Sequence, residues 1–154
     1  MQIRKLLIPT DFSDLAEHTL DYAIGLAAAL NASVELVHVH HSPALSLQNG
    51  ELTMPVDPTL GADYEANVRQ RLDKLAEKYQ ASGVKVSGCL LSGVPYAEII
   101  RAAEDGSADL IVMGTHGRTG LAHLLMGSVA ERVVRRSPIP VLTVPSAERA
   151  RPAC

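Results

Sequence analysis

The chain has 154 residues, of which 47% are hydrophobic and 20% charged, and its formal net charge is −3. This length supplies one full core, so we expect a single domain over residues 1–145 and a flexible polar tail over residues 146–154. Aromatic residues make up only 3% of the chain and Trp is absent, which argues against the stacked aromatic surface that binds nucleic acid.

The sequence also argues against a membrane protein. No stretch has the length of a transmembrane helix, and residues 1–5 lead directly into a predicted strand without a signal-peptide pattern. Cys89 and Cys154 are far apart and form no C-x-x-C motif. We therefore expect a cytoplasmic protein.

The first part of the chain predicts two strands and the helix between them. Residues 3–9 form the first strand, which ends at Pro9 because Pro has no N–H for a ladder. Residues 10–14 are typical of a helix start, and Asp14 with Glu17 has the pattern of a capping box. Residues 34–39 predict a strand buried on both faces. Small and apolar residues recur on one face of the helix, at Ala16, Leu20, Ala23, Ala27 and Leu30.

Residues 41–60 contain three prolines and no clear periodicity, and they predict a long loop. A flap over a site and a disordered segment are both compatible with this composition. A long helix follows and ends at Gly83. Its expected buried face consists of Tyr64, Val68, Leu72, Leu75 and Tyr79.

The remaining elements alternate in the same way. We predict strands at residues 84–91, 110–113 and 141–144, with helices from Pro95 to about Gly106 and over residues 129–136. Strands that alternate with helices favour an α/β fold, a doubly wound five-stranded parallel sheet with helices on both faces.

A glycine-rich stretch follows the strand at 110–113. Glycines at 114, 117 and 120 let a bulky group approach the backbone N–H groups, and Gly127-Ser128 begins a helix whose first amides favour an anion such as phosphate. The glycines alone would predict only a tight turn. The chain has neither G-x-x-x-x-G-K-[ST] nor G-x-G-x-x-G after a strand.

The spacing Gly114-x-x-Gly117, nine residues and Gly127-Ser128 resembles the nucleotide motif of the universal stress protein family, in its ATP-binding branch. Residues 8–13, 113–118, 124–129 and 137–144 are similar to that family as well, so the resemblance covers almost the whole chain. It implies an adenine nucleotide alpha hydrolase-like fold with strand order 3-2-1-4-5. It also implies a homodimer in which the edge strand Val141–Val144 pairs with its twin.

In such a sheet a ligand lies beyond the carboxyl ends of the strands, where the strand order reverses. Asp11 could accept hydrogen bonds from ribose hydroxyls, or it could serve as a helix cap; the resemblance favours the ribose. The resemblance also implies that Pro9, Thr10 and Val39 line the adenine and that Met113 contributes its backbone.

The phosphates are expected at the glycine loop and the helix that follows it. Backbone N–H groups and one hydroxyl supply the donors, and two further side chains of the loop could meet phosphate oxygens. The phosphate site is expected at Gly114, His116, Gly117, Arg118, Gly127, Ser128 and Val129.

A metal site and a catalytic site are less well supported. His38 and His40 alternate along a strand and could chelate zinc together with His41 or His116, but the rest of a ligand set is missing. Mg²⁺ that accompanies the phosphates is the better expectation. No G-x-S-x-G elbow and no lysine beside the loop is present, so we predict binding with at most slow hydrolysis.

The sequence therefore predicts an ATP-binding stress protein, with ADP or AMP as other candidate ligands, whose nucleotide state regulates contacts with an unknown protein partner. A dimerising adaptor that holds no nucleotide is one alternative, and a slow ATPase or phosphotransferase is another. A flavodoxin-like FMN carrier has a similar topology, but the chain lacks aromatics to enclose a flavin.

Overall fold

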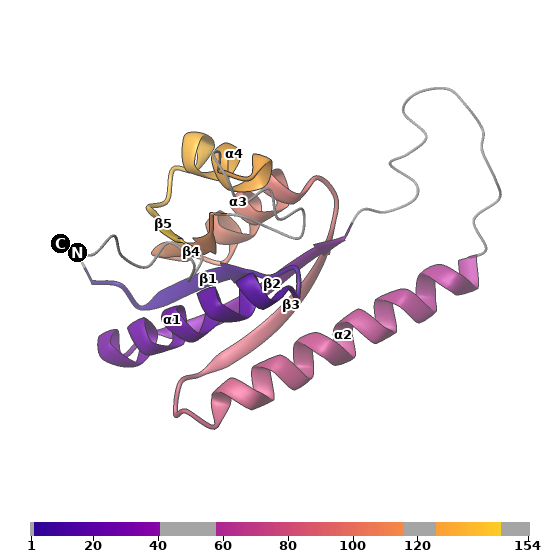
Figure 1. Cartoon of the computed structure of the whole chain (residues 1–154), viewed down its shortest axis with the longest axis horizontal. Coiled ribbons are helices and arrows are strands. Elements are labelled where there is room, and N and C mark those ends of the chain that lie inside the picture. Colours follow the sequence, from indigo (N-terminus) through magenta and orange to yellow (C-terminus); the bar gives the residue numbers. More distant parts are fainter. Residues whose placement is uncertain (1, 41–57, 116–125, 146–154) are drawn as a thin grey trace, which may run out of the picture.

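The computed structural model describes residues 2–40, 58–115 and 126–145 (Figure 1). Within these ranges strands and helices alternate, as the sequence predicts. The elements are β1 (Lys5–Pro9), α1 (Asp14–Leu30), β2 (Ser33–His40), α2 (Pro58–Gln80), β3 (Val86–Ser92), α3 (Pro95–Asp105), β4 (Leu110–Gly114), α4 (Ser128–Arg136) and β5 (Val141–Val144).

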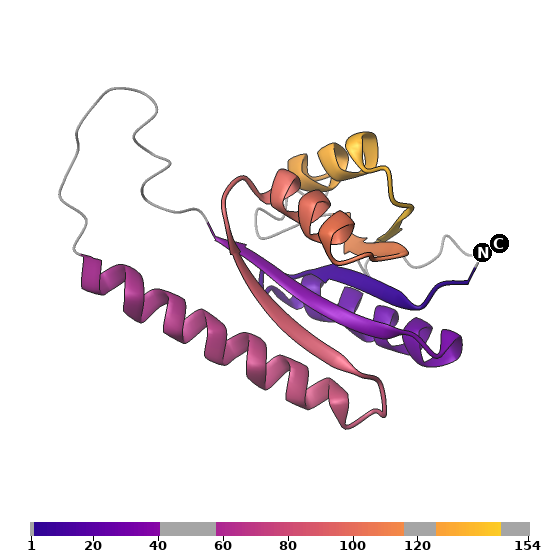
Figure 2. The same cartoon turned by 180° about the vertical axis from the view of Figure 1, so that it is seen from behind.

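The five strands form one parallel sheet in the order β3-β2-β1-β4-β5, which confirms the predicted topology. Helices α1 and α2 cover one face of the sheet and α3 and α4 the other (Figures 1 and 2). The molecule therefore has three layers and two apolar cores, with β1 in the middle of the sheet.

Strand β1 shows why the central strands are apolar throughout. Leu6 and Ile8 point into the core beneath α1 and α2, whereas Leu7 points into the core beneath α3 and α4. All three side chains are at most 1% exposed. Because both faces are covered, polar residues cannot alternate with apolar ones along this strand.

Helix α1 begins and ends with specific caps. Ser13 is the N-cap, and its Oγ accepts a hydrogen bond from the backbone N–H of Ala16. Asp14 is thus the first helical residue and not the cap that a capping box with Glu17 requires. At the other end Asn31 adopts a left-handed backbone conformation with φ of 53°.

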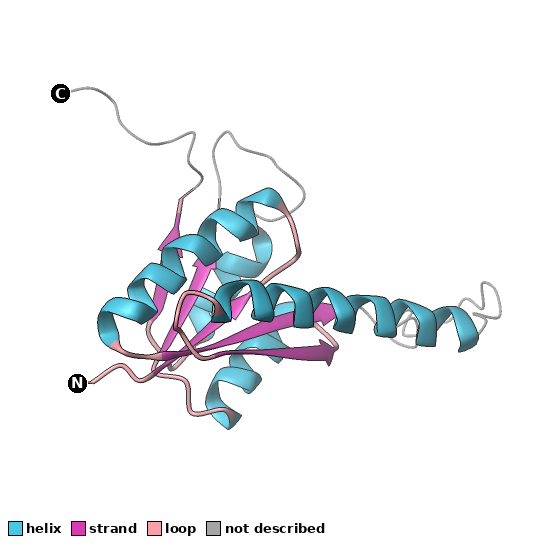
Figure 3. Ribbon diagram, turned by 90° about the horizontal axis from the view of Figure 1, so that it is seen from below, coloured by secondary structure: helices cyan, strands magenta, loops and turns pink. Residues whose placement is uncertain are grey.

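Two predicted core positions are wrong. Tyr64 is 50% exposed and Leu30 is 38% exposed. Helix α2 begins at Pro58, inside the predicted loop, and reaches beyond the ends of β2 and β3 (Figure 3). Tyr64 lies at the end of the sheet, where its ring is 5.9 Å from the ring of His40, the last residue of β2. Leu30 is the last residue of α1.

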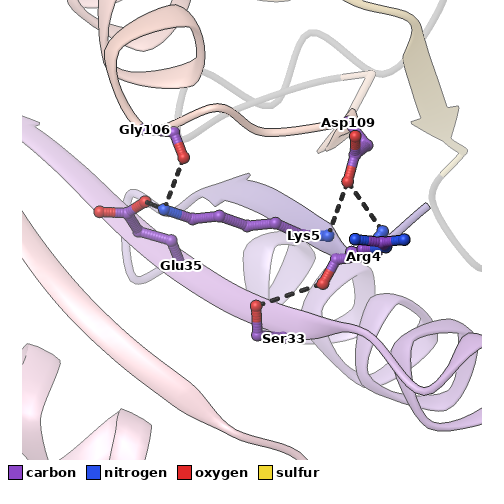
Figure 4. A network of polar contacts seen from close by, with 6 residues as sticks. All are labelled: Arg4, Lys5, Ser33, Glu35, Gly106 and Asp109. Atoms are coloured by element: carbon purple, nitrogen blue, oxygen red, sulfur yellow. Dashed lines mark hydrogen bonds and ion pairs between the residues drawn. The ribbon is translucent and has the colours of Figure 1, made fainter. Parts of the chain in front are cut away.

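A polar network joins the amino ends of the strands, at the edge of the sheet opposite to the predicted site (Figure 4). Asp109 Oδ2 accepts hydrogen bonds from the backbone N–H groups of Arg4 and Lys5, at 2.8 and 3.0 Å. Lys5 Nζ lies 2.6 Å from Glu35 Oε2 and donates to the carbonyl oxygen of Gly106. The network therefore fixes the start of β1 against its neighbours.

Candidate functional site

The strand order brings the carboxyl ends of β1, β2 and β4 to one edge of the sheet (Figure 1). Backbone pairing between β1 and β2 continues to Pro9↔Val37. Between β1 and β4 it covers only Leu6↔Leu110 and Leu7↔Ile111. The two central strands thus stop pairing before their carboxyl ends, at the switch point where a ligand is expected in this class of fold.

Four of the predicted site residues lie in the strands at this edge, and the fourth, Gly114, ends β4. Pro9 ends β1, and Val39 is the residue before the end of β2. Met113 is the penultimate residue of β4 and is 5% exposed. Strand topology therefore gathers residues that lie far apart in the sequence.

The turn between β1 and α1 carries Thr10 and Asp11. The backbone N–H of Thr10 donates to Val37 O at 2.8 Å, and Thr10 Oγ1 accepts from the N–H of Phe12 at 3.1 Å. Phe12 has a φ of 61°, a left-handed conformation that costs a residue with a Cβ roughly 1–2 kcal/mol. The turn is thus held in an unfavourable backbone conformation by its own hydrogen bonds.

Asp11 is part of the same turn. Its Oδ1 accepts hydrogen bonds from the N–H and the hydroxyl of Ser13, at 3.0 and 2.6 Å. Ser13 in turn caps α1. Helix α1 is therefore capped by Ser13 and not by Asp11, which the sequence had offered as a possible cap. Asp11 instead holds Ser13 in place and lies just after the end of the central strand.

On the other side of the switch point, α4 begins next to the end of β4. Gly114 ends β4, and the N–H of Gly127 donates to Thr115 O at 2.7 Å. Ser128 and Val129 form the first turn of α4, where backbone amides have no partner within the helix. The Gly127 amide, expected at a phosphate, thus has a protein acceptor in this structure, and the amides of Ser128 and Val129 remain the helix-start donors.

His116, Gly117 and Arg118 lie outside the described residues. His41, considered as a metal ligand, does so as well. In the ranges that the structure describes, no group of three or more His, Cys, Asp or Glu side chains is arranged to hold a metal ion. Among the helices of residues 2–40, 58–115 and 126–145, none combines the length and the hydropathy of a membrane span.

Sequence reasoning considered His38 only as a metal ligand. In the structure its Nδ1 lies 2.8 Å from the carbonyl oxygen of Thr10, and its ring packs 4.7 Å from the ring of Phe12. Both contacts are with the turn that carries Asp11. The only available signal was the position of His38 near the end of β2, which does not reveal the direction of its ring.

Comparisons of the sequence and of the structure with known proteins point to the same family. Residues 2–145 match the model of the universal stress protein family. Universal stress protein MJ0531 of Methanocaldococcus jannaschii is 39% identical over 142 residues, which cover 92% of this chain and 81% of that protein. The solved structure of protein MJ0577, from the same organism, is 31% identical with a TM-score of 0.79, covering 95% of this chain and 98% of that one.

A further solved structure is relevant to the ligand. It is a universal stress protein in complex with cAMP, with 26% identity and a TM-score of 0.68. The match covers 94% of this chain and 98% of that chain.

Proposed function

The chain belongs to the universal stress protein family, and on this basis we propose that it binds ATP at the carboxyl edge of its sheet. In this proposal the nucleotide state regulates contacts with a protein partner during stress. ADP and AMP are the other candidate ligands. We place the protein in the cytoplasm and assign residues 1–145 to one domain.

The observation that best supports the proposal is that two structural features suited to a nucleotide lie at the switch point. Thr10 and Asp11 follow the central strand on one side, and the first turn of α4 lies beside the end of β4 on the other. The first offers a carboxylate for ribose hydroxyls, and the second offers backbone amides and a helix dipole for phosphates. A relative in complex with cAMP supports an adenine nucleotide as the ligand.

The roles are distributed along this edge. Asp11 binds the ribose, and the adenine is lined by Pro9, Thr10, Val39 and the backbone of Met113. The phosphates lie against the glycine loop and α4. The residues assigned to them are Gly114, His116, Gly117, Arg118, Gly127, Ser128 and Val129.

Mg²⁺ enters with the nucleotide in this proposal. It is coordinated mainly through phosphate oxygens and water, as is usual for Mg²⁺ bound to a polyphosphate. The ion would neutralise part of the charge of the phosphates. Any hydrolysis is slow, and a turnover of about 1 per second or more, the range of ordinary enzymes, would contradict a binding role.

The test is to denature the purified protein and identify the released small molecules by mass spectrometry. We expect ATP or ADP from the wild type and none from Gly117→Val, because a branched side chain blocks the approach of phosphate to the loop. Gly25→Ala is the matched control, since a Cβ at this position in α1 meets nothing within 4 Å.

Two outcomes would change the assignment. An empty wild type that also fails to bind added ATP would leave the dimerising adaptor as the function. Equal nucleotide content in the wild type and Gly117→Val would show that the glycine loop is not the phosphate site.

A further inference from the structure

Phe12 is the residue of the β1–α1 turn with the least favourable backbone conformation. Two side chains from other elements contact its ring. The ring of His38, in β2, lies 4.7 Å away between centroids, and the guanidinium carbon of Arg71, in α2, lies 4.3 Å from the centroid of the Phe12 ring. Contacts of this kind can offset the cost of a left-handed residue, because the turn must keep its shape to retain them.

Thr10 is fixed to β2 at both of its backbone polar groups. Its N–H donates to Val37 O at 2.8 Å, and its carbonyl oxygen lies 2.8 Å from His38 Nδ1. A carbonyl oxygen can only accept, so Nδ1 must carry the proton of this hydrogen bond. The His38 side chain is 8% exposed, so water competes little for this hydrogen bond.

We propose that His38 is a positioning residue of the nucleotide site. It does not touch the ligand: through the Thr10 carbonyl and the Phe12 ring it holds the turn that presents Asp11. This inference rests on the proposed function, because Asp11 must be a ribose ligand for its position to affect affinity. It also gives the buried His38 a role other than metal binding.

The inference predicts which part of the ligand is affected. Loss of the His38 hydrogen bond shifts the turn with Thr10 and Asp11, and so weakens the hold on adenosine. The amides at the start of α4 do not depend on His38, since α4 is attached to the end of β4 through Thr115. Affinity for ATP and adenosine should therefore fall by a similar factor, whereas affinity for inorganic tripolyphosphate should stay the same.

The experiment is calorimetry of ATP, adenosine and tripolyphosphate binding with three variants. His38→Leu removes the donor, and the dissociation constants of ATP and adenosine should rise about tenfold, the effect of one buried hydrogen bond. His38→Asn keeps an N–H donor in the place of Nδ1 and should bind within about threefold of the wild type. His18→Leu, at an exposed position of α1, is the matched control and should bind as the wild type does.

The outcomes separate this inference from the proposed function. A wild type that binds neither ATP nor adenosine overturns the proposed function, and this inference with it. If the wild type binds and His38→Leu binds equally well, His38 has no positioning role although the nucleotide site stands. Equal losses in His38→Leu and His38→Asn, or a parallel loss of tripolyphosphate binding, would also contradict positioning through the hydrogen bond.

Discussion

Asp109 shows how one side chain can join two strands that are distant in the sequence. Its carboxylate accepts hydrogen bonds from the backbone N–H groups of Arg4 and Lys5, and these bonds lower the pKa of Asp109 (Figure 4). A carboxyl group with a lowered pKa in the folded state stabilises the fold above its unfolded pKa of about 3.9. This contribution is lost as the pH falls through the folded pKa.

We therefore expect Asp109→Asn to lower the free energy of unfolding at pH 7 and to have a smaller effect at pH 3. Urea unfolding at the two pH values measures the difference. The exposed Asp73, replaced by Asn in the same way, is the control and should change stability little at either pH. An effect of Asp109→Asn that is equal at pH 7 and pH 3 would contradict the role of the charge.

The individual residues of the proposed site could be predicted only in part from the sequence. Pro9, Asp11 and Gly114 follow from the rule that ligands bind at the carboxyl ends of parallel strands. The contact of His38 with Thr10 could not be predicted, because a strand pattern gives the face of a side chain but not the direction of its ring. The hydrogen bond from Gly127 N–H to Thr115 O could not be predicted either, since it depends on where the start of α4 lies relative to the end of β4.

Helix α1 ends at Asn31, whose backbone has the left-handed conformation. Asn31 has a φ of 53°, and beyond it the N–H of Ala32 reaches back to Ala27 O at 2.9 Å. Gly adopts this conformation without strain because it has no Cβ, and Asn tolerates it because its short polar side chain can form local hydrogen bonds, whereas Ala is strained in it.

Asn31→Ala should consequently lower the free energy of unfolding by about 1 kcal/mol, while Asn31→Gly should leave it unchanged or raise it slightly. Urea unfolding at pH 7 measures both. Ala28→Gly is the matched control, because Ala28 is an exposed helical residue where Gly costs about 1 kcal/mol. If Asn31→Gly were as destabilising as Ala28→Gly, the left-handed cap would not matter.

Most elements were predictable because their patterns are local. Strand β5 has the predicted bounds, and β4 extends the predicted strand by one residue. The start of α2 was not predictable, since Pro58 fits a loop as well as a first helical turn. The exposure of Tyr64 depends on where the sheet ends beside the helix, which periodicity within the helix cannot show.

For the whole molecule, β5 is the element that bears on assembly. It lies at the edge of the sheet and pairs with β4 on one side. The carbonyl oxygens of Pro140 and Val144 accept hydrogen bonds from the β4 side. By the alternation along a strand, Val141 and Thr143 direct their backbone groups to the open edge, where a second copy can pair.

We expect the wild type to be a homodimer and Thr143→Pro to shift it towards monomer, because Pro removes an N–H from the open edge but none from the ladder with β4. Light scattering after size exclusion, at several concentrations, measures the mass. Thr143→Val keeps the N–H and should remain dimeric. A dilute wild type that is monomeric, or a dimeric Thr143→Pro, would count against pairing through β5.

The central position of β1 in the sheet also affects how the protein folds during its synthesis. A ribosome makes β1 first, yet one of its two neighbours comes from the far half of the chain: 104 residues separate Lys5 from Asp109, which holds it. At a synthesis rate of about 5–20 residues per second, β1 is made several seconds before β4, and until then the side of β1 that pairs with β4 has no partner strand. The strand that leads to Thr10 and Asp11 is thus made before the other strands of the sheet, and its pairing is complete only after β4 has been made.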